Sequence, residues 1–450
     1  MMDEIKSEAI QDEMKKCAEE LLAWIGKCPS KYHAIQSMKE KYEERGFLPL
    51  EEQKEWKLKW GKNYVVTRNG VSLIAFRLPN KKEKVKGLHI AAAHCDSPTF
   101  QIKENPERSA GGYVTLNVEK YGGMIYSTWL DRPLSIAGRL AVEEKEGKIV
   151  SKLVNLDRDL LVIPNLAIHM NREMNKGVEY NPQVDLQPLF AVENTAKAAT
   201  EAKNGQESGN TLLRLLAQAA DVKPEKLLGH DLFLYVRDGG HILGAEGEML
   251  LSPRLDDLQC AYPLTRAHAD AKTGEYISLC AIFDNEEVGS GSQQGADSTF
   301  LEDVLVRMGE ALDLTQSELR QWIASGYMIS ADNAHAVHPN HPEKADPTNR
   351  PVLNGGIVIK YNSNQKYTTD GITGARLKSL CRKAGVPFQT YVNRSDVPGG
   401  STLGNISMAH VSIPSADIGL PQLSMHSAVE TGGTKDTWYL QKLMQMFFAQ

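Results

Sequence analysis

Apolar residues recur at helical spacing near the start of the chain, and short β-rich runs follow them. Residues 4–26 carry apolar side chains three or four positions apart. These side chains are Ile5, Ala9, Met14, Ala18, Leu21, Leu22 and Ile25. The spacing predicts an amphipathic helix, and a second helix is expected after Pro29, with Ser30 as its N-cap. Two runs at 64–66 and 72–76 flank Asn69-Gly70, a pattern that predicts a β-hairpin.

Four later apolar segments each lead into acidic or imidazole side chains. The segments span residues 87–93, 276–283, 326–330 and 411–418. Nearly continuous apolar runs of this length are typical of strands buried on both faces of a sheet. His94 follows the first run, Glu286-Glu287 the second and Asp332 the third, and His426 lies beyond the fourth. Ligands of open α/β sheets bind at the carboxyl ends of the strands, so we expect these groups to meet there.

The middle of the chain has a different pattern of apolar and polar residues. Apolar or alternating runs separated by glycine-rich turns predict an antiparallel β-rich unit. The runs span residues 113–118, 124–129, 134–142 and 149–153. The polar segment 192–210 is expected to be an exposed, mobile loop, and Asn210 is expected to cap a short helix over 211–220.

A chain of 450 residues exceeds what one hydrophobic core usually organises. We therefore expect an α/β catalytic domain with a mixed central sheet and helices on both faces. Residues 1–98 would form its first part and 246–450 its second, with 99–245 as an inserted β-rich oligomerisation domain. The net charge of -6 gives no reason to expect binding to nucleic acid.

The chain also lacks the signals of export and membrane insertion. Its first residues are charged and contain no apolar core of a signal peptide. No stretch approaches the roughly 18 apolar residues that a membrane span needs. The 6 cysteines are scattered without CxxC spacing. These features predict a cytoplasmic protein with reduced, buried thiols.

The candidate chemistry resides in histidine and carboxylate side chains. The candidate residues are His94, Asp96, Asp256, Glu286, Glu287, Asp332 and His426. Imidazole nitrogen and carboxylate oxygen suit zinc, and also cobalt or manganese. Such a set could hold two ions if one aspartate bridges them, and paired ions can together activate a water and polarise a carbonyl.

Single motifs in this set leave simpler interpretations open. Taken alone, His94-x-Asp96 is a weak signal that fits an ordinary hydrogen-bonded pair at a strand end, although Asp96 could instead orient His94 as a metal ligand. Glu286-Glu287 could be a solvated acidic turn. Adjacent acids after a buried strand are costly without a cation or proton, so one could bind metal while the other accepts a proton. Taken alone, His426 would be a structural histidine.

Longer motifs make the chain resemble a known family. The matching stretches are AAAHCDSP, EKYGGMIYSTWLDRPLSIAGR, IPNLAIHMNRE, LLSPRLDDL, FDNEEVGSGSQQGA, ISADNAHAVHPN, GGIVIKYNSNQKY and GLPQLSMHSAVETGGTKD. They span nearly the whole chain. Their order is that of the aspartyl aminopeptidases, which are dinuclear zinc exopeptidases, and the chain resembles a bacterial-type member.

The resemblance implies a role for each candidate residue. His94 and Asp332 would bind one zinc ion, and Glu287 and His426 the other. Asp256 would bridge both ions. The family's general base corresponds to Glu286, and Asp96 would support His94.

The resemblance also implies substrate contacts and assembly. Substrate-facing positions correspond to His335 and Lys360, and His169 would reach the active site of a neighbouring subunit. Dimers would assemble into a tetrahedral dodecamer. Where the family pattern has Asn, this chain has Asp257, and related enzymes imply a cis bond between Asp256 and Asp257.

The implied activity is removal of N-terminal residues from peptides by a two-zinc-bridged water and a glutamate base. Lys360 would favour an acidic first residue, unless it forms a structural ion pair instead. Two alternatives remain. One is another two-metal amide hydrolase on this fold, either a deacylase or a carboxypeptidase. The other is a catalytically inactive shell or cargo-binding protein.

Overall fold

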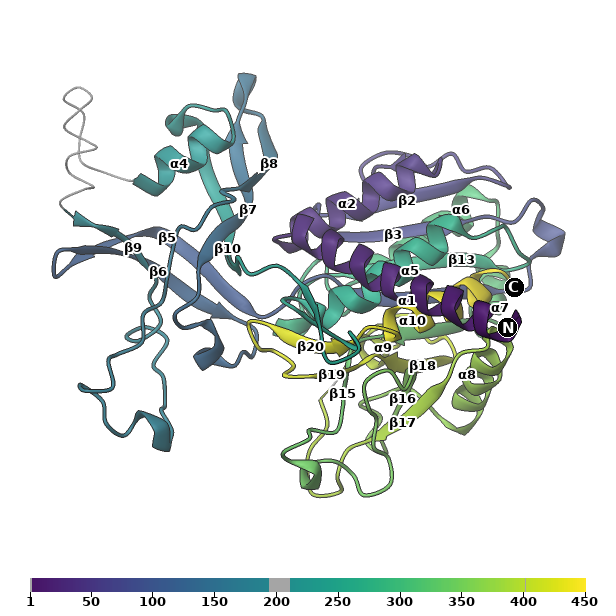
Figure 1. Ribbon diagram of the computed structural model, residues 1–450. Helices are drawn as coiled ribbons and strands as arrows, with labels where there is room; N and C mark the ends of the chain where they lie inside the picture. The colour runs from purple at the N-terminus through teal and green to yellow at the C-terminus, as the bar shows by residue number, and fades with distance from the viewer. Residues whose placement is uncertain (1, 194–210, 401) are drawn as a thin grey trace. The chain divides into compact units, whose positions relative to one another are not determined.

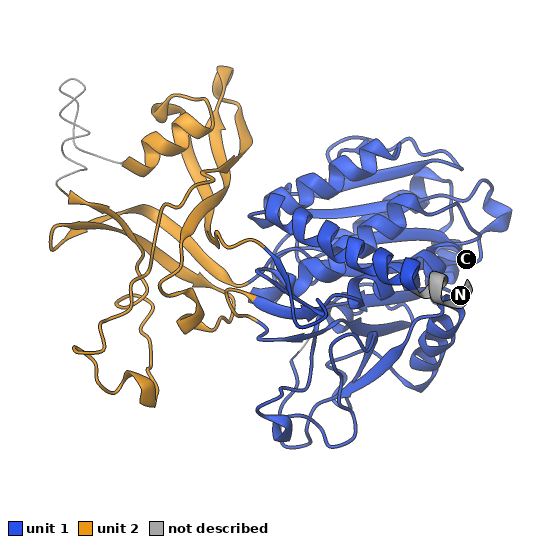
Figure 2. Cartoon of the chain, in the orientation of Figure 1, with its two compact units in different colours: residues 1–97, 240–425, 430–450 blue, residues 98–239, 426–429 orange. Residues whose placement is uncertain are grey.

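The chain contains two compact units. A computed structural model describes residues 2–193, 211–400 and 402–450, with side chains described from residue 8 onward. Unit 1 comprises Met1–Ser97, Gly240–Met425 and Glu430–Gln450, and unit 2 comprises Pro98–Gly239 and His426–Val429 (Figure 2). The loop expected over 192–210 lies outside the described residues from 194 onward, as does Asn210, the expected cap of the following helix.

Unit 1 is built on a 9-stranded mixed sheet with the strand order β1-β2-β3-β13-β4-β14-β18-β16-β17 (Figure 1). Its strands are β1 (Leu48–Leu50), β2 (Asn63–Arg68), β3 (Ser72–Arg77), β4 (Leu88–His94), β13 (Ile277–Phe283), β14 (Tyr327–Ala331), β16 (Ile357–Tyr361), β17 (Phe388–Val392) and β18 (Ser415–Gly419). The predicted hairpin is confirmed: β2 and β3 pair antiparallel, and Asn69 and Gly70 between them have φ values of 52° and 65°.

The centre of this sheet is parallel and contains the four predicted apolar segments. β13, β4, β14 and β18 are consecutive parallel neighbours. Phe283 at the end of β13 pairs in register with His94 at the end of β4. Parallel strands present their carboxyl ends at one edge, so the residues that follow these strands are brought to the same edge of the sheet.

Helices cover both faces of the sheet. They are α1 (Met2–Lys27), α2 (Lys31–Glu44), α5 (Leu255–Asp270), α6 (Phe300–Ala311), α7 (Gln316–Ala324), α8 (Gly371–Ala384), α9 (Leu403–Ser407) and α10 (Asp436–Phe448). Successive strand residues point to opposite faces. Ile90 of β4 therefore joins a core with Phe300 of α6, whereas the ring of its neighbour His89 stacks on Phe447 of α10. The predicted α/β class is confirmed.

A smaller 5-stranded sheet of unit 1 has the order β11-β12-β20-β19-β15. Its strands are β11 (His241–Leu243), β12 (Met249–Ser252), β15 (Ala334–His335), β19 (Pro421–Leu423) and β20 (Glu430–Gly433). β15 begins only three residues after β14 ends, and β19 begins two residues after β18 ends. Both connections leave the carboxyl edge of the large sheet, so the small sheet is joined directly to that edge.

Unit 2 is an antiparallel sheet of 6 strands with the order β8-β7-β10-β5-β6-β9. Its elements are β5 (Thr99–Ala110), β6 (Tyr113–Tyr121), β7 (Leu134–Glu143), β8 (Ile149–Asn155), β9 (Leu189–Val192), β10 (Leu227–Val236) and the helix α4 (Thr211–Ala219). The segment 124–129 is not the expected β run, because Tyr126–Trp129 forms a 3-10 helix. Both the N–H and the hydroxyl of Thr128 donate to the carbonyl of Ile125, which closes a helical turn.

The predicted N-cap residue of α2 is confirmed in its position. Ser30 occupies the N-cap position of α2, but its side chain makes no capping hydrogen bond. Its Oγ lies 2.8 Å from Nδ1 of His33 instead. A nearby imidazole therefore competes with the backbone N–H groups that a serine cap would satisfy.

Two further findings concern the whole described chain. All 6 cysteines lie in the described part and are buried with free thiols. Among the described residues, no helix combines the length and the apolar character that a bilayer crossing would demand.

The core predicts a marked difference between two isoleucines. Ile90 is fully buried in β4, whereas Ile372 of α8 is 81% exposed. Ile90→Ala should lower the free energy of unfolding by about 2–5 kcal/mol because it leaves a cavity. Ile372→Ala should change it by no more than about 0.5 kcal/mol. Urea titration followed by circular dichroism measures both, and equal midpoints for the two variants would contradict this placement of the core.

Candidate metal centre

His94 is the last residue of β4, and its two ring nitrogens face different carboxyl groups. Nδ1 lies 3.1 Å from the carbonyl oxygen of Asp96 and 3.4 Å from its Oδ1. Nε2 lies 3.5 Å from Oδ1 of Asp256 and 3.7 Å from Oδ1 of Asp332. A proton on Nδ1 that is held by Asp96 leaves the lone pair of Nε2 directed at the other two acids, as metal-binding histidines require.

Asp256 is held in a sharply bent segment at the start of α5. The predicted cis bond between Asp256 and Asp257 is confirmed, and both residues depart from helical geometry. The N–H of Asp256 donates to Oε2 of the buried Glu430 at 3.0 Å. Oδ2 of Asp257 accepts the backbone N–H of His94 at 3.2 Å. These two bonds tie the bend to β20 on one side and to the end of β4 on the other.

The turn after β13 brings Glu286 and Glu287 to the same edge. The two acids begin a 3-10 helix, Glu286–Val288. Their backbone N–H groups donate to Oδ1 and Oδ2 of Asp96, each at 3.2 Å. The carboxylate of Asp96 therefore lies beside His94 and also fixes the backbone of the acidic pair.

Asp332 follows β14 and lies beside a buried lysine. Nζ of Lys360, on β16, is 3.5 Å from Oδ2 of Asp332 and donates to the carbonyl of Asn333 at 2.8 Å. The side chain of Lys360 is only 4% exposed. It also lies 5.4 Å from the centre of the Tyr367 ring. The ammonium is thus bonded to the segment that carries Asp332.

Two overlapping groups of possible metal ligands lie within unit 1. One contains His94, Glu286 and Glu287, and the other contains His94, Asp256 and Asp332. The ligand atoms of each group lie within 4.8 Å of one another. Imidazole nitrogen combined with carboxylate oxygen is a donor set that fits zinc.

The remaining predicted residues are His426, His169 and His335. His426 begins the segment His426–Val429 of unit 2, where its carbonyl accepts the N–H of Ile125 at 3.0 Å. Its chain neighbour Met425 belongs to unit 1. His169 is exposed in a turn of unit 2. His335 is exposed on β15, with its ring 6.1 Å from that of Tyr391.

The ionisation of the acidic pair reflects its crowding. Burial raises the pKa of Glu286 to about 8; His94 opposes this rise, and Asp332, Asp96 and Asp256 add to it. Burial likewise raises the pKa of Glu287 well above its ordinary value, and the nearby Asp256 raises it further. A bound cation would have the opposite effect on both groups.

Sequence reasoning missed a buried amide network behind the ligands. Nδ2 of Asn333 donates to Gln422 at 2.7 Å and to Gln259 at 3.2 Å, and its Oδ1 accepts the thiol of Cys260. Gln422 in turn lies 3.5 Å from Glu430, which holds the N–H of Asp256. Gln422 and Glu430 fall inside a family motif, but no spacing in the sequence distinguishes them from their neighbours.

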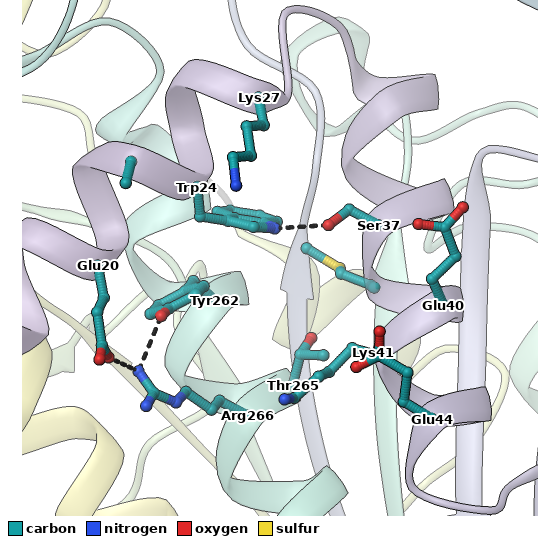
Figure 3. Close-up of a pocket in the computed structure, with 12 residues that line it drawn as sticks. Glu20, Trp24, Lys27, Ser37, Glu40, Lys41, Glu44, Tyr262, Thr265 and Arg266 are labelled. Carbon is teal, nitrogen blue, oxygen red and sulfur yellow. Dashed lines mark hydrogen bonds and ion pairs between the residues drawn. The ribbon is translucent and has the colours of Figure 1, made fainter.

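A separate cavity of about 440 Å³ lies between α1, α2 and α5 (Figure 3). The described residues that line it include none of the predicted site residues. Its polar groups bond to one another: Trp24 donates to Ser37 at 2.9 Å, and Arg266 bonds to Tyr262 at 2.8 Å and to Glu20. The cluster at the sheet edge is therefore the candidate site.

The chain is similar to known proteins over nearly its whole length. Residues 24–448 match the family described as "Aminopeptidase I zinc metalloprotease (M18)". A relative named "Probable M18 family aminopeptidase 2" from Clostridium acetobutylicum is 43% identical over 433 residues, which cover 96% of this chain and 98% of the relative. "Aspartyl aminopeptidase 1" from Schizosaccharomyces pombe is 38% identical, over 96% of this chain and 95% of that protein.

Solved structures show the same fold. A cryo-EM structure of an Ape4 and Nbr1 complex superposes with a TM-score of 0.93 at 38% identity, covering 97% of this chain and 86% of that one. A structure of the S. cerevisiae mApe1 dodecamer gives a TM-score of 0.83 at 29% identity, with 96% of each chain covered. The chain therefore belongs to the M18 family of zinc metallo-aminopeptidases.

The raised carboxyl pKa values predict how the metal-free protein responds to pH. Glu286 titrates at about 8 in the folded protein, compared with 4.5 ordinarily, so between these values the folded state binds more protons than the unfolded state. Stability of the chelator-treated protein should therefore fall as pH rises through this window. Thermal unfolding midpoints across the window measure the effect.

Glu286→Gln is the matched control for this pH dependence. It removes the titrating carboxyl at nearly constant shape, so its midpoint should fall less steeply across the same window. A wild-type midpoint that rises relative to that of the variant would contradict the assignment.

Proposed function

We propose that this protein removes the N-terminal residue of peptides with two zinc ions at the carboxyl edge of the large sheet. His94 and Asp332 would bind one ion, Glu287 and His426 the other, and Asp256 would bridge them. The observation that carries the proposal is the position of His94, whose Nε2 faces Asp256 and Asp332. The family's zinc chemistry and the donor set support it.

Zinc held by these residues would act as a Lewis acid that lowers the pKa of water and polarises the peptide carbonyl. The carboxylate of Glu286 accepts the proton of the attacking water and passes it to the departing amine. Its backbone is bonded to Asp96, so the base acts from a fixed position. Glu287 lies next to it, and positive charge in the site would keep both acids ionised.

Substrate binding and assembly complete the proposal. The substrates are peptides with a free N-terminus, and His335 would contact them. The mApe1 structure is a dodecamer, so we infer that this chain also forms homo-oligomers, through the inserted β-rich domain. His169, exposed in that domain, would then reach the site of a neighbouring subunit. We infer the tetrahedral dodecamer from the same resemblance.

The proposal also includes a substrate specificity: a preference for Asp or Glu as the first residue of the peptide. Lys360 is the candidate determinant of this preference. The bonds of Lys360 to Asp332 and Asn333 also support the other role foreseen for it, a structural ion pair. The structural role and the role in specificity are compatible if the ammonium group of Lys360 pairs with Asp332 and also faces the substrate side chain.

Replacing the base tests the mechanism. Glu286→Gln should lower kcat by at least about 100-fold, because the neutral amide cannot accept the proton of the water. Zinc content should stay unchanged, since Glu286 is not a ligand in this proposal. Steady-state kinetics on a leucyl or aspartyl anilide, with metal analysis of the same sample, checks both. Wild-type turnover in a fully zinc-loaded variant would disprove the role of Glu286.

A substrate panel tests specificity and separates the competing hydrolases. Aspartyl and glutamyl anilides should exceed leucyl, lysyl and alanyl anilides in kcat/KM, and Lys360→Met should reduce the acidic advantage by about tenfold. Acetylating the substrate amine should abolish cleavage. Persistent cleavage of acetylated substrates would favour a deacylase or carboxypeptidase, and equal rates for all anilides would remove the acidic preference.

A further inference from the structure

A buried ion pair joins the first turn of α2 to the end of β13. Nζ of Lys31 lies 2.8 Å from Oδ1 and 3.0 Å from Oδ2 of Asp284. The side chain of Lys31 is 8% exposed and that of Asp284 is fully buried. A charge buried to this degree is strongly unfavourable without its partner, so each residue depends on the other.

Asp284 is also the residue at which the acidic turn begins. It directly follows β13 and precedes Asn285, which has a φ of 62°. Nε2 of Gln294 donates to Asp284 at 3.2 Å and to Asn285 at 2.9 Å. The hydroxyl of Ser292 donates to the same Asn285 oxygen at 2.7 Å. These bonds hold the side chains of Asp284 and Asn285, the two residues immediately before Glu286.

The other side of the turn is fixed by Asp96, through the N–H groups of Glu286 and Glu287. Asp96 and Asp284 repel each other electrostatically, and burial raises the pKa of Asp284, whereas Lys31 lowers it. The turn is thus held at both ends by a carboxylate, Asp284 before it and Asp96 beside it. Lys31, from a helix that is distant in sequence, supplies the positive charge that neutralises Asp284.

We propose that Lys31 is a positioning residue for the general base: through Asp284 it holds the turn that places Glu286. This inference rests on the proposed function of Glu286. The competing explanation is that the pair merely fastens α2 to the sheet. A shift of the base by about 1 Å can reduce a rate by about 100-fold, so the two explanations differ in their effect on kcat.

The experiment compares Lys31→Met, Asp284→Asn and the double variant with the wild-type enzyme. The control is Lys39→Met, which removes a half-exposed lysine of the same helix that pairs with Glu43. Urea midpoints, zinc content, kcat and KM are measured for each. Lys31→Met should lower the midpoint, and the double variant should recover most of that loss because neither charge is left unpaired.

The value of kcat distinguishes a role of Lys31 in placing Glu286 from a role only in attaching α2 to the sheet. Although its stability recovers, the double variant should keep a kcat at least about tenfold below that of Lys39→Met, with KM within about twofold. If Lys31→Met does not fold, the double variant alone decides. A folded, zinc-loaded double variant with the kcat of the control would overturn the proposal.

Failure of the proposed function gives a different result. A wild-type enzyme without peptidase activity would refute that function, and with it the role of Lys31 in placing the base. The stability coupling between Lys31 and Asp284 would still be measurable in that case. Activity in the wild-type enzyme together with unaltered kcat in the double variant would refute the role of Lys31 alone.

Discussion

Repulsion among buried carboxylates is the constraint on which this site depends. Asp256 and Asp257 are almost fully buried, and Glu286, Glu287 and Asp332 are half-buried beside them. In a poorly solvated space such groups must be protonated or neutralised by cations. The raised pKa of Glu286 favours its protonated form, and bound zinc would instead neutralise the carboxylates. The surrounding structure keeps these acids together despite their mutual repulsion.

The sheet supplies most of that restraint. The parallel register of β4 and β13 sets His94 beside the residue before Asp284, and β14 adds Asp332 at the same edge. Hydrogen bonds then connect these separate strand ends, since Asp96 holds the backbone of Glu286 and Glu430 holds that of Asp256. The fold thus holds the candidate ligands close together by itself, and such preorganisation would favour ion binding because few side chains would remain to be ordered.

The sequence predicted the parts of this arrangement that depend on local pattern. The apolar runs before His94, Glu286 and Asp332 form central strands of the sheet, and helices pack against both faces of these strands. Contacts between distant segments were beyond such reasoning: Lys31 meets Asp284 only because α2 packs close to the end of β13. The prediction of β structure over 124–129 rested on the apolar residues of this run. It was wrong because a hydrogen bond from the Thr128 hydroxyl to the carbonyl of Ile125 closes a helical turn, and the apolar pattern gives no sign of that bond.

The number of zinc ions bound per chain tests the account most directly. Equilibrium dialysis of the metal-free protein against buffered zinc, followed by elemental analysis, gives that number. The account predicts two ions per chain, and Asp256→Asn should weaken both together because it replaces one carboxylate oxygen by an NH2 group and removes the negative charge that the two ions share. Saturation at one ion, or a variant that retains both affinities, would contradict the shared site.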